Sequence, residues 1–99
     1  MVDVLKSRAV LLYLSVGRES YPKHAPDALG IAFGRRESEE LRGYVEGLLT
    51  EMYAIPVDWQ MHSLLSGTAA VEAEMRVRHP ELSNEAIRAL GWDFSYSWR

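Results

Sequence analysis

Apolar positions recur at helical spacing through most of this chain, and the first such run predicts a helix over residues 3–17. The run has 4-3-4 spacing at Leu5, Ala9, Leu12 and Val16. Asp3 is placed to cap the start of this helix and Gly17 to cap its end. Because residues 10–14 are apolar nearly all round, we expect the helix to lie at the centre of the fold. A buried strand over residues 9–16 is the alternative.

The clearest helical pattern covers residues 38–54. Its apolar stripe has 4-3-4-3 spacing at Leu41, Val45, Leu48, Met52 and Ile55. Ser38 is a favourable N-cap, and Pro56 stops the pattern. Gly43 and Gly47 lie four residues apart on one side, where they would permit another helix to approach closely.

A further long helix is predicted from Asp58, as its N-cap, to about Arg78, where His79-Pro80 ends it. Its apolar positions are Met61, Leu64 or Leu65, Thr68, Val71 and Met75. The small residues 67–70 at its middle could receive a neighbouring helix or a large aromatic ring. Residues 18–36 are irregular, apart from a short helical turn at 28–33 that Asp27 would cap and Gly34 would end.

The C-terminal segment is rich in aromatic residues. Ser83 or Asn84 would cap a helix that runs to Leu90, with Gly91 as its left-handed cap. Beyond it, four rings alternate strictly with other residues: Trp92, Phe94, Tyr96 and Trp98. We expect an extended segment with all four rings on one face, which must cover a core, pair with another copy or dock a partner. A helical continuation is the alternative, because Ile87, Leu90, Phe94 and Trp98 have 3-4-4 spacing.

These patterns predict a mostly α protein, with residues 1–99 forming one compact domain of three to four helices and an aromatic C-terminal segment. The alternative is an α+β fold with strands near 9–16 and 92–98. Hydrophobic residues make up 47% of the chain and charged residues 25%, which is ordinary for a globular domain. The absence of cysteine excludes disulfides, thiolate metal sites and a cysteine nucleophile. The sequence carries no recognisable signal peptide or membrane-spanning segment, so we expect a soluble, cytoplasmic protein.

The net charge of −3 is unevenly distributed. Residues 37–58 carry six acidic side chains and a single base, Arg42. Such a helix could face a basic partner, or it could be a solvated outer surface.

Candidate catalytic or metal-binding groups are sparse. Asp58 and His62 are spaced i, i+4, which suits an oriented base or half of a metal site. A third ligand would have to come from elsewhere in the chain: His24, Glu72, Glu74 or His79. No nucleophile elbow, phosphate loop or dinucleotide motif is present, so the sequence predicts no cofactor and no metal. In the irregular region, the side chains that could take part in function are those of Tyr21, Lys23 and His24.

Residues 82–91 look like the first helix and glycine turn of a helix-turn-helix motif. The following eight residues supply one arginine and four large rings, whereas a recognition helix needs donors for bases and phosphates. The net negative charge also argues against nucleic acid as a partner. A DNA-binding regulator that uses residues 82–99 therefore remains only an alternative.

The sequence favours a small, non-enzymatic protein-interaction or regulatory protein. It could be an acidic inhibitor of the immunity-protein type or a homo-oligomeric accessory subunit, and a small enzyme using Asp58 and His62 is a further alternative. The candidate partner-binding residues are Glu39, Glu40, Glu46, Glu51, Trp92, Phe94, Tyr96 and Trp98.

Overall fold

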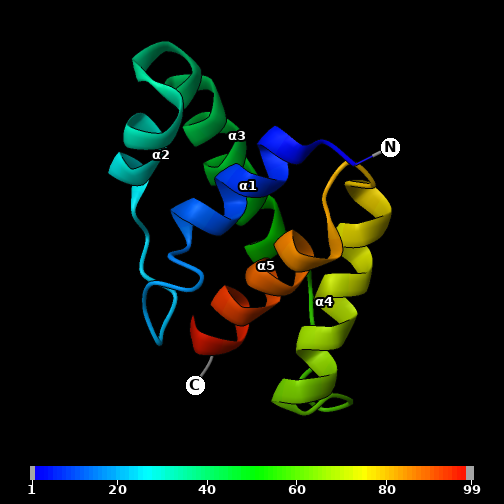
Figure 1. Ribbon diagram of the computed structural model, residues 1–99. Coiled ribbons are helices and arrows are strands. Elements are labelled where there is room, and N and C mark those ends of the chain that lie inside the picture. The colour runs from blue at the N-terminus through cyan, green and yellow to red at the C-terminus, as the bar shows by residue number, and fades with distance from the viewer. Residues whose placement is uncertain (1, 98–99) are drawn as a thin grey trace.

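The computed structural model describes residues 2–97, and within that range it contains five helices and no strand. They are α1 (Val4–Tyr13), α2 (Pro26–Phe33), α3 (Arg35–Tyr53), α4 (Leu64–Arg78) and α5 (Asn84–Ser97). Helix α5 lies in the middle and packs against α1, α3 and α4, while α2 packs on α1 and α3 (Figure 1). The predicted mostly α fold is confirmed. The α+β alternative is wrong, because the segments proposed as strands lie mainly in α1 and α5.

Helix α1 is shorter than the predicted 3–17. Its N-cap is Asp3, as expected, and the Asp3 carboxylate accepts a hydrogen bond from the Lys6 N–H at 3.0 Å. The helix ends at Tyr13 because the chain then turns back, with Ser15 at φ 61° and Gly17 at φ 81°. The Ala25 N–H reaches the Tyr13 carbonyl at 2.7 Å and closes this connection against the helix end.

The starts of α2 and α3 also differ from the prediction. Ala25, not Asp27, is the N-cap of α2, and Asp27 lies in its first turn. Gly34, at φ 83°, ends α2 and leads directly into α3 at Arg35. Ser38 therefore lies inside α3, and its hydroxyl donates to the Arg35 carbonyl instead of capping the helix.

Helix α4 begins six residues after the predicted cap at Asp58. Ser63 is the N-cap, in a capping box with Ser66: each backbone N–H bonds to the other residue's hydroxyl. Asp58 instead caps a separate turn, where its carboxylate accepts from the Gln60 N–H at 3.0 Å. The small-residue patch does receive a ring, because a Cβ at Gly67 would lie 2.8 Å from the Trp59 indole.

The predicted extended aromatic segment is wrong over the described residues. Helix α5 begins after Ser83, whose hydroxyl accepts from the Ala86 N–H, and it continues through Gly91 to Ser97. Gly91 is buried, and the side chain of Glu72 on α4 occupies the space that a Cβ there would need. Close contact between α4 and α5 thus explains a glycine that resembles a helix terminator. The 3-4 spacing of Ile87, Leu90 and Phe94 places all three in the core.

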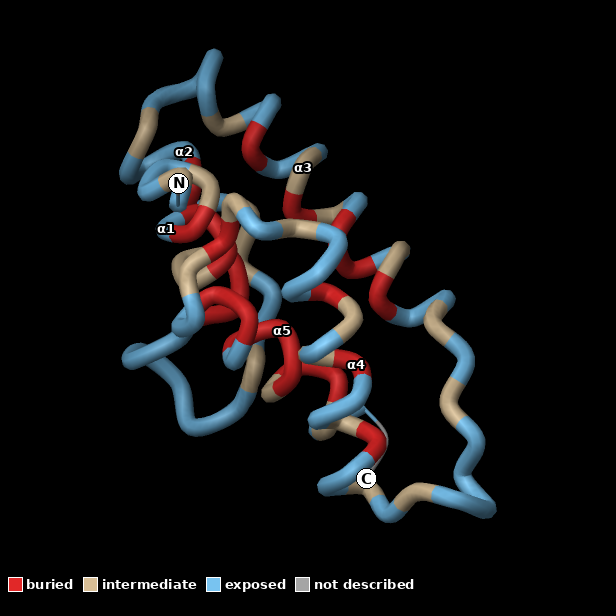
Figure 2. Tube along the Cα trace, turned by 90° about the vertical axis from the view of Figure 1, so that its right-hand side faces the viewer, coloured by how far each residue is buried: buried red, intermediate tan, exposed pale blue. Residues whose placement is uncertain are grey.

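Figure 2 shows buried positions along the inward sides of the helices, whereas the connections at residues 16–24 and 54–63 carry exposed and half-buried positions. The largest fully buried side chains come from all five helices and the turn after α1: Val10, Leu14, Leu29, Val45, Met52, Val71, Met75, Ile87, Leu90 and Phe94. Among the described residues, no helix combines the length and the apolar character that crossing a membrane requires.

Candidate protein-binding surfaces

Glu46, one of the acidic residues predicted to bind a partner, makes contacts within the molecule. Its carboxylate accepts hydrogen bonds from the Tyr13 hydroxyl at 3.0 Å and from Arg42 Nε at 3.1 Å. These two bonds hold the pKa of Glu46 below its usual range. Burial, together with the bond to Glu46, raises the pKa of Tyr13 to about 12. Glu46 therefore joins α3 to α1.

Glu51 belongs to a second internal cluster. It lies 2.9 Å from His79 Nε2 and 3.2 Å from the Arg78 guanidinium, and the hydrogen bond from His79 is the main reason that the pKa of Glu51 is lowered. His79 Nδ1 lies 3.1 Å from Glu81, which also accepts from the Tyr44 hydroxyl at 2.5 Å. The cluster joins α3 to the turn between α4 and α5.

Glu39 and Glu40 are the two predicted acidic residues that remain open to solvent. Both lie near the start of α3, and neither side chain makes a hydrogen bond or an ion pair within residues 2–97. The four predicted carboxylates are thus not one uniform free surface. Binding of a basic partner by Glu39 and Glu40 stays a prediction.

Phe94 is a core residue. It is 1% exposed and stacks between Trp59, at a centroid distance of 6.2 Å, and Tyr53, at 5.9 Å. This packing leaves Phe94 almost no surface for the partner contact that the alternating pattern suggested.

The other aromatic residues of α5 point in different directions, because successive odd or even positions on a helix do not share a face. Trp92 is half-buried, and Tyr96 is 43% exposed with its ring 6.4 Å from that of Tyr21. Trp98 lies outside the described residues. The described rings therefore do not form one continuous aromatic surface.

Trp92 lines a groove between α1 and α5. Two hollows, of about 290 and 220 Å³, share Leu11 and Glu85 and together extend from the N-terminal end of α1 to the turn after it. We call them the α1–α5 groove, and its apolar lining comprises Val2, Val4, Leu11, Val16, Ala89 and Trp92. Sequence analysis singled out Trp92 but not its neighbours, because the groove exists only once α1 and α5 lie side by side.

Helix α4 is apolar on two opposite sides. One side carries the buried residues Gly67, Val71 and Met75, and packs on α5. The opposite side, which we call the α4 outer face, consists of Leu65, Ala69, Ala73 and Val77 at four-residue intervals. Leu65 is 83% exposed and Val77 is 78% exposed, so no described helix covers this face.

Asp58 and His62 line one cavity of about 400 Å³ between residues 55–58 and α4, and the His62 N–H donates to the Asp58 carbonyl at 3.0 Å, but their side chains do not bond to each other. His62 Nδ1 instead lies 3.2 Å from the Ser66 hydroxyl. Within residues 2–97, no three His, Asp or Glu side chains are grouped so that they could hold a metal ion. The enzyme alternative thus has a cavity but no paired acid and base.

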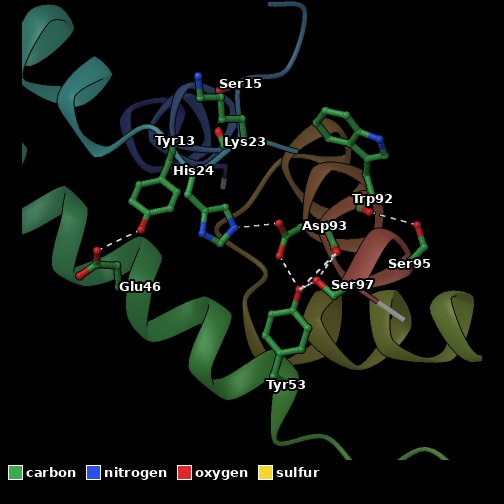
Figure 3. Close-up of polar contacts among 10 residues, drawn as sticks. All are labelled: Tyr13, Ser15, Lys23, His24, Glu46, Tyr53, Trp92, Asp93, Ser95 and Ser97. Atoms are coloured by element: carbon green, nitrogen blue, oxygen red, sulfur yellow. Dashed lines mark hydrogen bonds and ion pairs between the residues drawn. The ribbon is translucent and has the colours of Figure 1, made fainter. Parts of the chain in front are cut away.

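Sequence analysis missed a polar cluster around the buried residue Asp93 (Figure 3). Asp93 is 3% exposed, and its carboxylate accepts from His24 Nε2 at 2.8 Å and from the Tyr53 hydroxyl at 2.5 Å. Burial, and then the bond to Asp93, raise the pKa of Tyr53 above its usual range. Figure 3 shows the three side chains converging from the α1–α2 connection, α3 and α5. His24 lies 69 residues from Asp93 along the chain, so local spacing gave no signal of the pair.

The glycine turn expected for a helix-turn-helix motif does not form. Gly91 lies inside α5, and α5 buries Ala86, Ile87, Leu90 and Phe94 against its neighbours. The segment proposed to read DNA is therefore largely a core helix.

No protein-family model matches this chain, and comparisons with curated proteins and with solved structures likewise give no match. Function must therefore be argued from the surfaces themselves.

Proposed function

We propose that this chain is a non-enzymatic protein-interaction protein that pairs with a second copy of itself through the α4 outer face. The observation that carries the proposal is the exposure of Leu65 and Val77 on the side of α4 opposite its buried stripe. A helix that is apolar on opposite sides is typical of a helix covered on both. Helix α5 covers only one side of α4.

The order of side chains along the α4 outer face supports a second copy as the occupant. The face runs large, small, small, large, from Leu65 through Ala69 and Ala73 to Val77. In an antiparallel pair, Leu65 of one copy lies opposite Val77 of the other, and the alanines lie opposite each other. Such an interface is self-complementary, as two-fold symmetry requires, and the alanines permit close approach of the helices.

The area available points to a weak complex. Burying Leu65 and Val77 on both copies contributes about 6–12 kcal/mol in total, at about 1.5–3 kcal/mol for each side chain. Association costs about 4–15 kcal/mol in lost translational and rotational freedom. The most favourable combination of these values leaves about 8 kcal/mol, which corresponds to a dissociation constant of about 10⁻⁶ M, so we expect dimerisation in the range of about 10⁻⁶ to 10⁻³ M.

Sedimentation velocity across a dilution series tests the proposal. We expect the wild-type chain to dimerise as its concentration rises and Leu65→Glu to remain monomeric, because the substitution places a charge in the interface. Ile31→Glu is the matched control: Ile31 is 89% exposed on α2, so its substitution should leave the association unchanged. A wild-type chain that stays monomeric at about 10⁻³ M, or a Leu65→Glu variant that still dimerises normally, would contradict the proposal.

A further inference from the structure

We propose that the α1–α5 groove binds an acidic amphipathic helix of another protein. The groove is separate from the α4 outer face, because α5 packs against α1 and α4 and so lies between the two surfaces. The proposal therefore does not depend on self-association, and both surfaces can be occupied at once.

The apolar character of α1 provides the first argument. Helix α1 packs against α2, α3 and α5, yet its outer side keeps apolar surface exposed: Val4 is 76% exposed, and Val16, just after the helix, is 41% exposed. Between these two ends, Leu11 and Trp92 add apolar lining, beside the polar residues Ser7 and Ser83. Exposed apolar surface that is concave and bordered by polar residues is typical of a protein-binding site.

The walls of the groove are held in place before any partner arrives. The Ser83 N–H donates to the Ser7 hydroxyl at 2.9 Å, which ties the start of α5 to α1. The Asp3 N–H donates to the Glu81 carbonyl at 2.7 Å and anchors the N-terminal end. A groove with fixed walls loses little conformational entropy when it is occupied.

The charges along the groove identify the partner's chemistry. Arg8 borders it from α1 and Arg88 from α5, with Glu85 as the single acidic residue in the lining. This lining is net positive on a chain whose net charge is −3. Within residues 2–97 neither arginine forms an ion pair. The Arg8 guanidinium lies 5.7 Å from the centroid of the Phe33 ring, a contact that does not neutralise its charge. Burial raises the pKa of Glu72, and the charge of Arg88 offsets part of that rise. Acidic side chains of a partner would complement both arginines.

The dimensions favour a helix as the bound segment. The groove follows the whole of α1, and ten helical residues span about 15 Å. A helix of about three turns would place apolar residues at i, i+3 or i+4, and i+7 over Leu11 and Trp92. Tryptophan and arginine are also the residues most often found at interface hot spots.

A charge-swap titration tests this inference. The probe is a synthetic helical peptide of about 16 residues with leucine at i, i+3, i+7 and i+10 and glutamate on both flanks, compared with a version that carries lysine in place of glutamate. We expect the glutamate peptide to shift the Trp92 indole resonance and the amide resonances of residues 4–16 and 85–92 in ¹⁵N NMR spectra of the full chain.

Arg88→Glu combined with Arg8→Glu should weaken binding of the glutamate peptide about tenfold and strengthen binding of the lysine peptide. Arg36→Glu, an exposed arginine near the start of α3, is the matched control and should change neither affinity. If the double variant unfolds, Val16→Asp provides a second test, because it places a charge at one end of the groove and should also weaken the glutamate peptide.

Three outcomes would overturn the inference: equal binding of the two peptides, resonance shifts confined to other surfaces, or no binding at about 1 mM peptide. The Leu65→Glu variant distinguishes the two proposals, because it should remain monomeric and still bind the glutamate peptide with wild-type affinity.

Discussion

Gly43 and Gly47 should each be replaceable by alanine with a gain in stability. Both lie in the middle of α3 and are exposed, and a Cβ at either position would meet no atom within 4 Å among its possible neighbours. The close helix approach that their spacing suggested does not occur within residues 2–97. Glycine in a helix interior costs about 0.5–1 kcal/mol relative to alanine, because glycine has more conformational freedom in the unfolded chain and loses it on folding.

The expected gain is about 0.5–1 kcal/mol for each single variant and about 1–2 kcal/mol for the double variant. In a domain of this size, about 1 kcal/mol raises Tm by about 4–8 °C. Urea unfolding followed by far-UV circular dichroism measures the free energy directly, and a thermal scan provides an independent value.

Gly67→Ala is the informative contrast. A Cβ there would lie 2.8 Å from the Trp59 ring and 3.2 Å from Val57, and Trp59 cannot move away freely because it stacks on Phe94. Overpacking costs about 1–3 kcal/mol, which exceeds the helix-propensity gain of about 1 kcal/mol. We therefore expect a net loss of stability of up to about 2 kcal/mol.

Destabilisation by Gly43→Ala or Gly47→Ala would refute the reasoning. It would mean that the outer side of α3 is covered in solution. The dependence of that effect on protein concentration would then show whether a second copy covers it, since association adds stability by mass action.

Two further substitutions test the electrostatics of the interior. Asp93→Asn should lower the free energy of unfolding by about 1–3 kcal/mol, because the bonds from His24 and Tyr53 lose a charged, buried acceptor. Urea unfolding of the single and double variants with His24→Ala measures the coupling energy between the two residues. A coupling energy near zero would contradict the pairing. Glu72→Gln should stabilise the protein at pH 7, because burial raises the pKa of Glu72 and the folded state therefore disfavours its charged form. The sign follows from the raised pKa: this penalty develops as pH rises through the carboxyl range. The advantage of Glu72→Gln should accordingly disappear as pH falls below about 4, and an advantage that grew in acid would show that the assignment is wrong.

Local sequence was sufficient to predict the buried positions and the ends of a helix wherever these depend on residues of that helix alone. The apolar spacing in α3 predicted its buried positions Leu41, Val45, Leu48 and Met52, all of which lie in the core. Asp3 and Ser83 cap the helices that follow them, and His79-Pro80 ends α4. Caps and spacing succeed because the hydrogen bonds and faces concerned lie within one or two turns of the chain.

The predicted helix ends were wrong where contacts with distant segments of the chain decided the structure. Gly91 resembles a helix end, but the side chain of Glu72 lies against it and α5 continues. Asp58 is a good cap by type, but Val57 and Trp59 pack against Gly67 of α4 and Trp59 stacks on Phe94, so the helix starts only after Ser63.

The candidate surfaces show the same division between what local sequence predicts and what contacts between distant segments decide. The sequence by itself determined that this is a mostly α chain, which positions on each helix are apolar, and that Trp92 is a residue of interest. Only the tertiary structure decided which apolar positions acquire neighbours: Phe94 enters the core, Trp92 lines a groove, and Leu65 is left exposed. The physical reason is that periodicity records the apolar faces of a helix, whereas burial depends on how many of those faces another helix reaches.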